Sequence, residues 1–434
     1  MDCMRIAIID ADLIGRKRHH FPNLVCEKIS GYYKEIKRLP PGNVVLKTDY
    51  ENLEEFDRIF VAKVFTDTPV PEWLQRIQQP EELLIRVGKP DAGELPVDIW
   101  LEKTVGCLYA GKIPVNVGGT GFFFDRAPNL PHVIEHCMPD YHLYDEWIEK
   151  KIMQAKEENQ KGEKKVNLRN LKNQFREYRE YSIGYLTRGC FRHCGFCVNQ
   201  KYNRVFRHSN LLEFYDKSRS KICLLDDNFF GYRNWRALLS QLIQTGKSFK
   251  FKQGMDERLL TDDMARMLFQ SKYDGDFTFA FDNIADYDLI HSKLRIISSN
   301  KQSKSKNVKF YVLVGFESTD DKDIVHAFQR IALLMQYQCI PYIMRYQNKN
   351  ETPWKTSPLR SMYVAIARWC NQPRIFKKMS FREFCEANQK LKKTPQLCSC
   401  MKAMVDFEKR NPDIAAQYFD LRYEQFIPGI NKNK

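Results

Sequence analysis

The sequence predicts an α/β protein with two sheet-containing parts. Short apolar runs near the N-terminus flank a helical stretch, the middle of the chain is charged and helical, and strand then alternates with helix six times. Six such repeats imply a parallel sheet that curls into a partial (β/α)6 barrel. In such a fold we expect chemistry at the carboxyl ends of the strands.

Composition limits the class of protein. A chain of 434 residues with 43% hydrophobic and 13% aromatic residues has room for two or three domains and is not disordered. No run reaches the ~18 apolar residues of a membrane span, and the N-terminus has the pattern of a first strand and not of a signal peptide. We therefore expect a cytoplasmic protein with no membrane partner. The net charge of +15 suggests an anionic partner such as nucleic acid, with a solvated surface as the alternative.

Residues 1–140 have the pattern of a small α/β domain. Buried parallel strands are short apolar runs, and a helix that opens with proline lies between the first two. The predicted elements are a strand at Arg5–Ile9, a helix at Phe21–Ile36 opened by Pro22, and strands at Asn43–Leu46 and Arg58–Phe65.

A charged helical connector is predicted over residues 141–180. Nine Lys or Arg and five Asp or Glu lie between Lys151 and Glu180. We interpret this segment as a solvated linker helix, and the alternative is an arm that binds nucleic acid.

Residues 181–346 carry the six strand and helix repeats, and residues 347–434 form a helical, basic C-terminal extension. The predicted strands are Ser182–Leu186, Lys221–Leu225, Phe249–Gln253, Asp276–Phe281, Val308–Val314 and Ile340–Arg345. The predicted helices cover about 210–218, 234–245, 262–271, 286–298, 320–337 and 358–370.

Three closely spaced cysteines follow the first of these strands. Cys190, Cys194 and Cys197 have a C-x3-C-x2-C spacing within YLTRGCFRHCGFCVNQ. Thiolates are soft ligands, and three in one loop can hold a single metal cluster. A structural zinc site needs four ligands, and His193 is badly placed as the fourth because it lies between two of the cysteines. An iron–sulfur cube on three cysteines keeps one iron open.

This motif, in a loop after strand one of a six-unit array, resembles that of the radical S-adenosylmethionine (radical SAM) superfamily. The front domain is similar to the Rossmann-like (flavodoxin/B12-binding-like) domain that precedes the barrel in one branch, whose reaction is unassigned. The resemblance implies that the three cysteines hold a 4Fe-4S cluster and that SAM binds its open iron. Reductive cleavage would give a 5′-deoxyadenosyl radical, with flavodoxin or ferredoxin as electron donor. Phe196 holds the place of the aromatic residue that lies against the adenine.

The resemblance also suggests contacts to SAM at the ends of strands two and three. Asp226, Asp227 and Asn228 replace the Gly-Gly-Glu that binds the SAM amino group in many relatives, and a simple turn is the alternative. Gln253, Asp256 and Arg258 follow strand three. Arg258 would bind the SAM carboxylate, and a salt bridge from Asp256 to Arg258 is the alternative.

Strands four and five supply the remaining predicted SAM contacts. Asp282 and Asn283 are candidates for the ribose hydroxyls. Gly315 matches the place where relatives let the adenine approach the backbone.

The sequence leaves open whether the front domain binds cobalamin. The branch often carries D-x-H-x-x-G after its first strand, with the histidine as cobalt ligand, whereas this chain has Asp12 at that position. The glycine-rich turn at residues 118–121 could approach a cofactor, and a plain tight turn is the commoner meaning.

The late cysteines have irregular spacing, and we interpret them as ordinary thiols. They are Cys370, Cys385, Cys398 and Cys400. The primary prediction is thus a radical SAM enzyme that acts on an unknown substrate. The alternatives are an RNA-modifying radical SAM enzyme that transfers a methyl or methylthio group, and a non-catalytic nucleic-acid-binding protein with a metal cluster.

Overall fold

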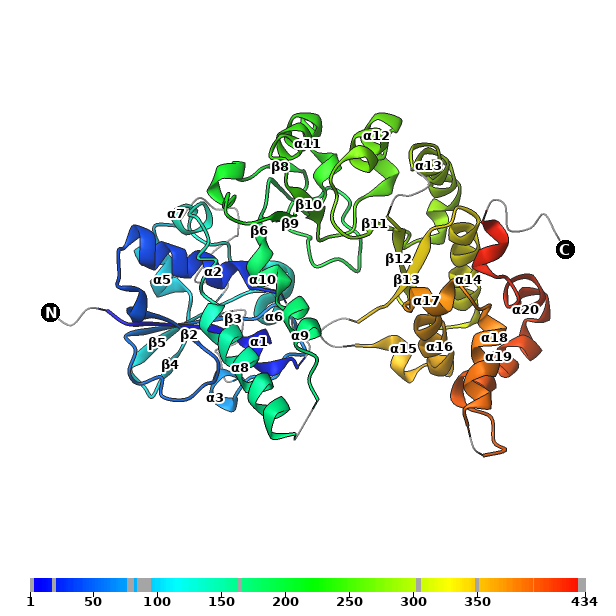
Figure 1. The fold of residues 1–434 in the computed structure, drawn as a ribbon, viewed down its shortest axis with the longest axis horizontal. Coiled ribbons are helices and arrows are strands. Elements are labelled where there is room, and N and C mark those ends of the chain that lie inside the picture. The colour runs from blue at the N-terminus through cyan, green and yellow to red at the C-terminus, as the bar shows by residue number, and fades with distance from the viewer. Residues whose placement is uncertain are drawn as a thin grey trace. The chain divides into compact units, whose positions relative to one another are not determined.

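The computed structural model describes residues 4–17, 21–75, 82–83, 95–162, 165–301, 306–347, 351–392 and 394–427. It is a mixed α/β structure with parallel sheets, as predicted (Figure 1). The chain divides into two compact units, Met1–Asp227 and Asn228–Lys434. The four-part division at residues 140, 180 and 346 stays a prediction. Among the described helices, none is both long and apolar enough to cross a bilayer.

The first unit contains a five-stranded sheet in the order β2-β1-β3-β5-β4. Its strands are β1 (Ile6–Asp10), β2 (Val44–Lys47), β3 (Arg58–Ala62), β4 (Val105–Tyr109) and β5 (Ile113–Gly118). All neighbouring pairs are parallel except β4 with β5, which is antiparallel. The sheet is an open α/β sheet with strands on both sides of β1. Its topological switch point lies at the carboxyl ends of β1 and β3, which is where ligands bind in such sheets.

Side chains on β1 alternate between two cores, one on each face of this sheet. Ile6 and Ile8 belong to one core, and Ala7 and Ile9 to the other. The first core is covered by helices α2 (Leu24–Gly31), α5 (Val97–Lys103), α7 (His132–Glu135) and α8 (Asp145–Lys161). The second core includes residues of α1 (Ala11–Gly15), α3 (Glu72–Gln75) and α6 (Thr120–Phe123). This two-sided burial explains why the strands are apolar throughout.

Helix α2 begins later than predicted. Asn23 is its N-cap, and the Asn23 side chain accepts a hydrogen bond from the backbone N–H of Val25 at 3.1 Å. The backbone N–H of Asn23 donates to the hydroxyl of Tyr144 at 3.0 Å. Pro22 therefore lies before the helix and not in its first turn. The last predicted turn, Tyr32–Ile36, is a π-helix.

The charged segment predicted as a connector is helical. It contains α8, α9 (Leu168–Gln174) and α10 (Arg176–Glu180). Ile148 and Ile152 of α8 are buried in the core under β1, while most of the charged residues of this helix are exposed. This amphipathic helix packs on the front sheet, which differs from the predicted free linker.

Strand β6 (Tyr181–Gly184) pairs in parallel with β9 (Lys221–Leu224) in the same unit. Two short strands, β7 (Thr187–Arg188) and β8 (Phe206–Arg207), pair antiparallel between them. These two ladders fix both ends of the loop at residues 189–205, which contains the three cysteines.

The helix predicted at 210–218 is wrong, because only a 3-10 turn at Leu211–Glu213 forms. The ring of Phe214 packs against Gly184, where a Cβ atom would stand 2.3 Å from the ring. The backbone N–H of Asp216 donates to the Ser182 hydroxyl at 3.0 Å. These contacts with β6 draw the segment out of a helical path, so tertiary packing overrides local propensity.

The second unit contains β10 (Ser248–Phe251) and a parallel three-stranded sheet in the order β11-β12-β13. These strands are β11 (Phe277–Ala280), β12 (Val308–Val314) and β13 (Ile340–Arg345). All lie within a few residues of the predicted limits. The residue Met255, just after β10, bridges in parallel to Phe279 of β11.

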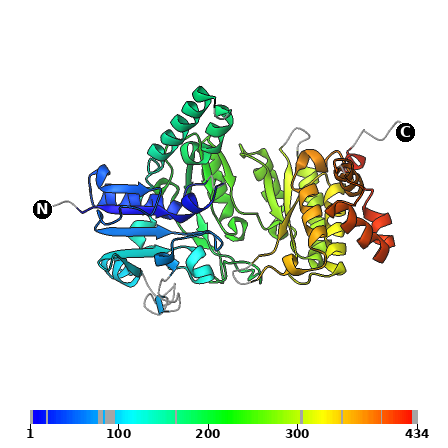
Figure 2. The same ribbon diagram turned by 90° about the horizontal axis from the view of Figure 1, so that it is seen from below.

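Helices of the second unit also agree with the predicted positions. They are α11 (Trp235–Gln244), α12 (Asp262–Gln270), α13 (Tyr287–Asn300), α14 (Asp321–Gln336) and α16 (Arg360–Cys370). The C-terminal extension is helical and adds α15 (Pro353–Thr356), α17 (Pro373–Phe376), α18 (Phe381–Lys390), α19 (Ser399–Arg410) and α20 (Pro412–Tyr418). Helix α14 packs on β12 and α16 on β13 (Figure 2).

Candidate metal centre

The cysteine loop is held at its base by backbone geometry. Thr187 pairs with Arg207 and Arg188 with Phe206, so residues on either side of the loop lie side by side. Gly189 has a φ of 89°, and a Cβ atom there would stand 2.3 Å from the carbonyl oxygen of Arg204. Only glycine fits this position, because a side chain would be both strained and overlapped.

Backbone N–H groups donate hydrogen bonds to each of the three cysteines of the loop, either to a sulfur atom or to a carbonyl oxygen. The Cys190 sulfur accepts from the N–H of Arg192 and the Cys197 sulfur from the N–H of Asn199, each at 3.4 Å. The N–H of Cys197 donates to the carbonyl of Cys194 at 2.9 Å, which closes a turn between the two cysteines. Amide donors to sulfur stabilise thiolates and are typical of iron–sulfur sites.

Exposure separates these cysteines from most of the others. Cys190, Cys194 and Cys197 are all half-exposed. The buried thiols among the described residues are Cys26, Cys137, Cys223, Cys339, Cys370, Cys385 and Cys400. Burial raises the pKa of Cys197, and the nearby Cys194 and Cys190 raise it further. Three adjacent thiols on an accessible loop therefore fit a metal group that would neutralise their charge better than they fit a packing role.

A single small metal ion fits the loop less well than a cluster. Within the described ranges, no three His, Cys, Asp or Glu side chains are placed to hold one ion. Each cysteine of a 4Fe-4S cluster binds a different iron, so the three sulfurs need not converge on a point. The donor set thus fits a cluster and departs from the closed four-ligand geometry of structural zinc.

Asp226, at the end of β9, anchors the strand that leads into the loop. Its carboxylate accepts from the N–H of Leu186 at 3.1 Å, and from both the N–H and the hydroxyl of Thr187 at 2.6 Å. The residue is 3% exposed, and burial raises its pKa to about 7. Its acceptor positions are used inside the protein.

Asp227 lies beside the cysteine loop itself. Its Oδ2 atom accepts from the N–H of Gly189 at 2.7 Å and lies 3.8 Å from Nε of Arg188. The side chain keeps 20% of its exposure. The carboxylate therefore fixes the first residue of the loop and remains partly accessible.

Phe196 is half-buried on the same loop, immediately before Cys197. Gln200 braces this part of the loop, because its Nε2 atom donates to the carbonyls of Cys194 at 2.6 Å and Cys197 at 2.9 Å. Lys201 then ties the end of the loop to Asn129 through an Nζ to Oδ1 distance of 2.6 Å.

Sequence reasoning missed an ionic network next to the loop. Arg188 lies 4.2 Å from the centre of the Tyr185 ring and 3.8 Å from a carboxylate oxygen of Glu135. Burial alone would lower the pKa of Arg188, but Tyr185, Asp227 and Glu135 raise it above its usual value. Glu135 also lies 3.5 Å from Nε2 of His208. A chain of charged and polar side chains thus runs from Asp227 through Arg188 and Glu135 to His208.

Three histidines extend this network. The rings of His132 and His136 are 4.1 Å apart, and those of His136 and His208 are 5.0 Å apart and stacked. Nδ1 of His136 lies 2.6 Å from Oε2 of Glu213. Burial and the nearby charge of Arg188 together lower the pKa of His208 to about 3, so His208 is neutral near pH 7. The i, i+4 spacing in HVIEH is the one sequence signal for this cluster.

In the second unit, Arg258 forms the salt bridge with Asp256 that was the alternative to binding the SAM carboxylate. Nε of Arg258 donates to Asp256 at 2.7 Å and NH1 to Asp286 at 3.3 Å. Nδ2 of Asn228 donates to the other oxygen of Asp256 at 3.3 Å. The guanidinium is thus already paired with two carboxylates. Gln253 is exposed and lies just before this group.

Asp282 and Asn283 both take part in local hydrogen bonds. Asp282 accepts from the N–H of Leu313 at 3.2 Å, and burial raises its pKa to about 6. Asn283 caps a 3-10 turn, and its Nδ2 donates to Glu317 at 3.0 Å. Their predicted contacts to ribose stay predictions.

Gly315 has the special backbone conformation expected of it, but its open side is covered. Its φ is 71°, and a Cβ atom there would stand 3.0 Å from Cβ of Trp354. Its N–H donates to buried Asp323 at 2.7 Å. Trp354 therefore lies where the adenine was expected to approach.

The front domain does not fit a cobalt-ligating site. Asp12, at the position of the ligand histidine, is buried and accepts from the N–H of Val64 at 2.6 Å and from the hydroxyl of Thr68. At the switch point of the sheet, Cβ atoms on Gly119 and Gly121 would stand within 2.4 Å of Lys63. With no imidazole at the ligand position and a packed crevice, we derive no cobalamin chemistry.

The comparisons with known proteins give little further support. No protein family matches the chain, and no curated protein does either. Among solved structures, it is similar to the radical S-adenosylmethionine methyltransferase TsrM from Kitasatospora setae, solved with tryptophan substrate and a SAM analogue. The match has a TM-score of 0.43 and 10% identity, and covers 78% of this chain and 72% of TsrM. At so low a TM-score the likeness supports no conclusion, so the proposals below depend on the residues of this chain.

Proposed function

We propose that this protein is a radical SAM enzyme. Cys190, Cys194 and Cys197 hold a 4Fe-4S cluster, and the enzyme modifies a substrate that is not yet identified. The observation that carries the proposal is the half-exposed loop of three thiols at the carboxyl end of β6, closed at its base by β7 and β8. When bound, the cluster supplies the electron that cleaves SAM to a 5′-deoxyadenosyl radical.

The residues around the loop position its ligands. Asp226 holds the strand before the loop, and Asp227 holds Gly189 at its first residue. The amide N–H groups of Arg192 and Asn199 donate to sulfur, which raises the reduction potential of a thiolate-bound cluster. These contacts therefore fix the spacing of the ligands and tune the potential of the cluster.

We assign the SAM amino group to Asp227 and not to Asp226. Asp226 is buried and has used its acceptors on Leu186 and Thr187, whereas Asp227 is partly exposed beside the cysteines. An ammonium group needs such accessible oxygen acceptors. The predicted contacts in the second unit, including Asp256 and Arg258, stay predictions.

Anaerobic reconstitution with iron and sulfide tests the proposal. The protein should bind about four irons per chain and release 5′-deoxyadenosine when given SAM and a strong reductant. Cys194→Ala should lose both properties. Cys107→Ala, at a half-exposed cysteine on β4, is the matched control and should keep both. A cluster of four irons that forms no 5′-deoxyadenosine would refute the catalytic proposal.

RNA modification is a second candidate, favoured by one surface of the second unit. Lys309, Tyr311 and Tyr342 lie on the open face of β12 and β13, opposite the face that packs on helices. Nζ of Lys309 is 5.6 Å and 5.7 Å from the two ring centres, which are 5.8 Å apart. Tyrosine rings stack bases, and an ammonium group binds phosphate.

Single-stranded RNA binding, read by fluorescence anisotropy, tests this candidate. Tyr342→Ala should weaken binding about tenfold, since one stacked base contributes roughly 1–3 kcal/mol. Lys309→Gln should reduce the salt dependence by about one phosphate contact, and Lys390→Gln on α18 should change neither. Equal affinities for all three variants would exclude this face as the RNA site. Tight RNA binding without SAM cleavage would favour the non-catalytic alternative.

A further inference from the structure

Three of the late cysteines come together in the helical extension of the second unit. Cys398 and Cys400 have their sulfur atoms 3.4 Å apart, and the thiol of Cys385 on α18 hydrogen-bonds to Cys400. The fourth, Cys370, is buried at the end of α16. The irregular sequence spacing thus conceals a local thiol cluster.

The helix start stabilises a thiolate at this cluster. Cys398 is the N-cap of α19, a helix of 12 residues, and Cys400 lies in its first turn. The side chain of Cys398 makes no capping hydrogen bond, and the backbone N–H of Met401 lowers the pKa of Cys400. Free N–H groups and the positive end of the helix dipole favour negative charge here.

The thiols therefore differ in protonation. Hydrogen bonds from Cys385 and Cys398, together with the charge of Arg368, outweigh burial and lower the pKa of Cys400 to about 6. The hydrogen bond to Cys400 and burial raise the pKa of Cys385, and burial raises that of Cys398. Near pH 7 the cluster holds one negative charge, centred on Cys400.

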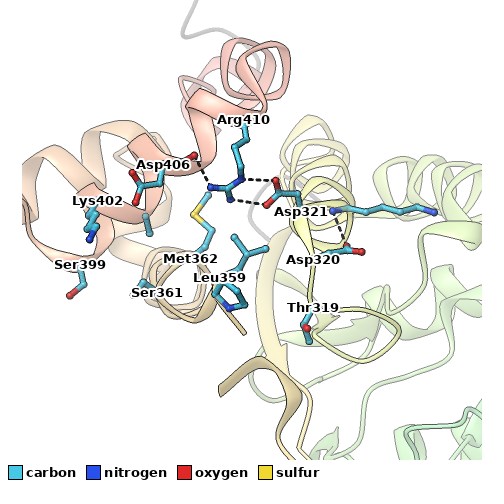
Figure 3. A pocket seen from close by; sticks show the side chains of 13 residues that line it. Thr319, Asp320, Asp321, Leu359, Ser361, Met362, Ser399, Lys402, Asp406 and Arg410 are labelled. Atoms are coloured by element: carbon cyan, nitrogen blue, oxygen red, sulfur yellow. Dashed lines mark hydrogen bonds and ion pairs between the residues drawn. The ribbon is translucent and has the colours of Figure 1, made fainter. Parts of the chain in front are cut away.

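Access to the cluster is graded. Cys398 is half-exposed, Cys400 is 6% exposed and Cys385 is fully buried. Ser399, between the two helix-start cysteines, lines a cavity of about 1160 Å³ together with Lys402, Asp320 and Leu359 (Figure 3). Neither Cys398 nor Cys400 lines this cavity, and Cys398 is the most accessible thiol of the cluster.

We propose that Cys398 and Cys400 form a thiol–disulfide exchange site whose substrate is a small disulfide. The exposed Cys398 sulfur, after passing its proton to Cys400, attacks one sulfur of the disulfide RSSR and releases RS⁻. That RS⁻ takes the proton from the Cys400 thiol and leaves as RSH, and the Cys400 thiolate then attacks Cys398 in the mixed disulfide and releases the second RS⁻. Overall, one cysteine thiol and one thiolate lose one proton and two electrons, and RSSR becomes RSH and RS⁻, which takes a second proton from solvent.

Geometry favours this chemistry over a metal site. The two sulfurs must close from 3.4 Å to about 2.05 Å, a small movement at the start of a helix. In the described part of the chain, no three His, Cys, Asp or Glu side chains are placed to hold one ion. Arg368 and Arg382 also act on the cluster electrostatically, which favours a thiolate over a bound cation. The site is independent of the proposed cluster in the first unit.

Thiol trapping on the full-length protein tests the proposal. The protein is equilibrated without oxygen in mixtures of reduced glutathione and glutathione disulfide, free thiols are alkylated, and peptides are identified by mass spectrometry. Cys398 and Cys400 should oxidise together in one two-electron step, while Cys385 and Cys107 stay reduced. Cys400→Ser should accumulate glutathione on Cys398, because the resolving thiolate is gone.

Two results would overturn the proposal. One is that both thiols stay free at potentials that oxidise a reference dithiol peptide. The other is stoichiometric zinc or iron that disappears in Cys398→Ser and not in Cys107→Ser. Serine is a favoured N-cap, so Cys398→Ser should keep α19 folded, and circular dichroism checks this. In Cys398→Ser, glutathione disulfide should oxidise the Cys400 thiol about tenfold more slowly or slower still, because the exposed thiol that reacts first is gone.

Discussion

Replacing Asp226 by asparagine removes a hydrogen-bond acceptor from the residue that anchors the cysteine loop, while the side chain keeps its shape. The carboxylate receives three hydrogen bonds, two at Oδ1 from Thr187 and one at Oδ2 from Leu186. An asparagine that keeps the Oδ1 contacts must present its NH2 group to the Leu186 N–H. Two donors then face each other at a buried site.

The size of the effect follows from these contacts. One lost hydrogen bond costs about 1 kcal/mol, and a buried donor left without a partner costs about 1–3 kcal/mol more. We expect Asp226→Asn to lower the free energy of local opening by about 2–4 kcal/mol. Because 1.4 kcal/mol corresponds to about a factor of ten, the Leu186 and Thr187 amides should exchange roughly 30-fold faster or more.

Hydrogen exchange by mass spectrometry measures this local opening directly. It suits a chain of two units better than a global unfolding curve, which need not be two-state. Asp98→Asn, at an exposed position in the first turn of α5, is the control and should change exchange little. Unchanged exchange at residues 184–189 in Asp226→Asn would refute the anchoring role.

Three further outcomes are expected. Gly189→Ala should abolish iron binding, because its Cβ would overlap Arg204 and the residue has positive φ; full iron content would contradict this. Tyr141→Phe should cost about 2 kcal/mol, measured by urea unfolding with a probe in the first unit, because the hydroxyl accepts from Ile183 N–H at 2.7 Å; an unchanged midpoint would argue against it. Burial raises the pKa of Glu257 from 4.5 to about 8, so the folded state keeps a proton that the unfolded chain releases. Stability from this group is complete below pH 4.5 and falls as pH rises to about 8, so Glu257→Gln should gain melting temperature relative to wild type between pH 5 and 8. A constant difference would refute the shift.

The strands were predictable from sequence because burial leaves a simple signature. Strand β1, buried on both faces, is a short apolar run, and β12 and β13, with one buried and one less buried face, match the predicted Val308–Val314 and Ile340–Arg345. The failed helix at 210–218 has local helical propensity, but Phe214 packs on Gly184 and Asp216 bonds to Ser182. Such contacts join residues about 30 positions apart, which no local pattern contains.

The candidate site was predictable only where its residues are contiguous. Three cysteines within one loop form a readable motif. By contrast, the network of Arg188, Glu135 and His208 joins separate segments and depends on the fold. The adenine contact at Gly315 stays a prediction, and no local pattern indicated that Trp354 packs against this glycine.

The net charge of +15 is only partly accounted for. The charged helix α8 packs one face on the front sheet and carries five Asp or Glu against four Lys, so this helix contributes nothing to the positive surplus. Lys309, between two tyrosines, is the basic residue with the clearest geometry for binding an anionic aromatic ligand. RNA binding at this face would give the charge a function.

The central claim is that three cysteines hold a cluster with one iron left open for SAM. Electron paramagnetic resonance of the reduced, reconstituted protein tests it most directly, with SAM labelled by 17O in its carboxylate. The account predicts that SAM changes the spectrum of the reduced cluster and that the label broadens it, and that Cys194→Ala gives no such signal. A reduced four-iron cluster whose spectrum is unchanged by SAM would mean that the site is closed, and would contradict the account.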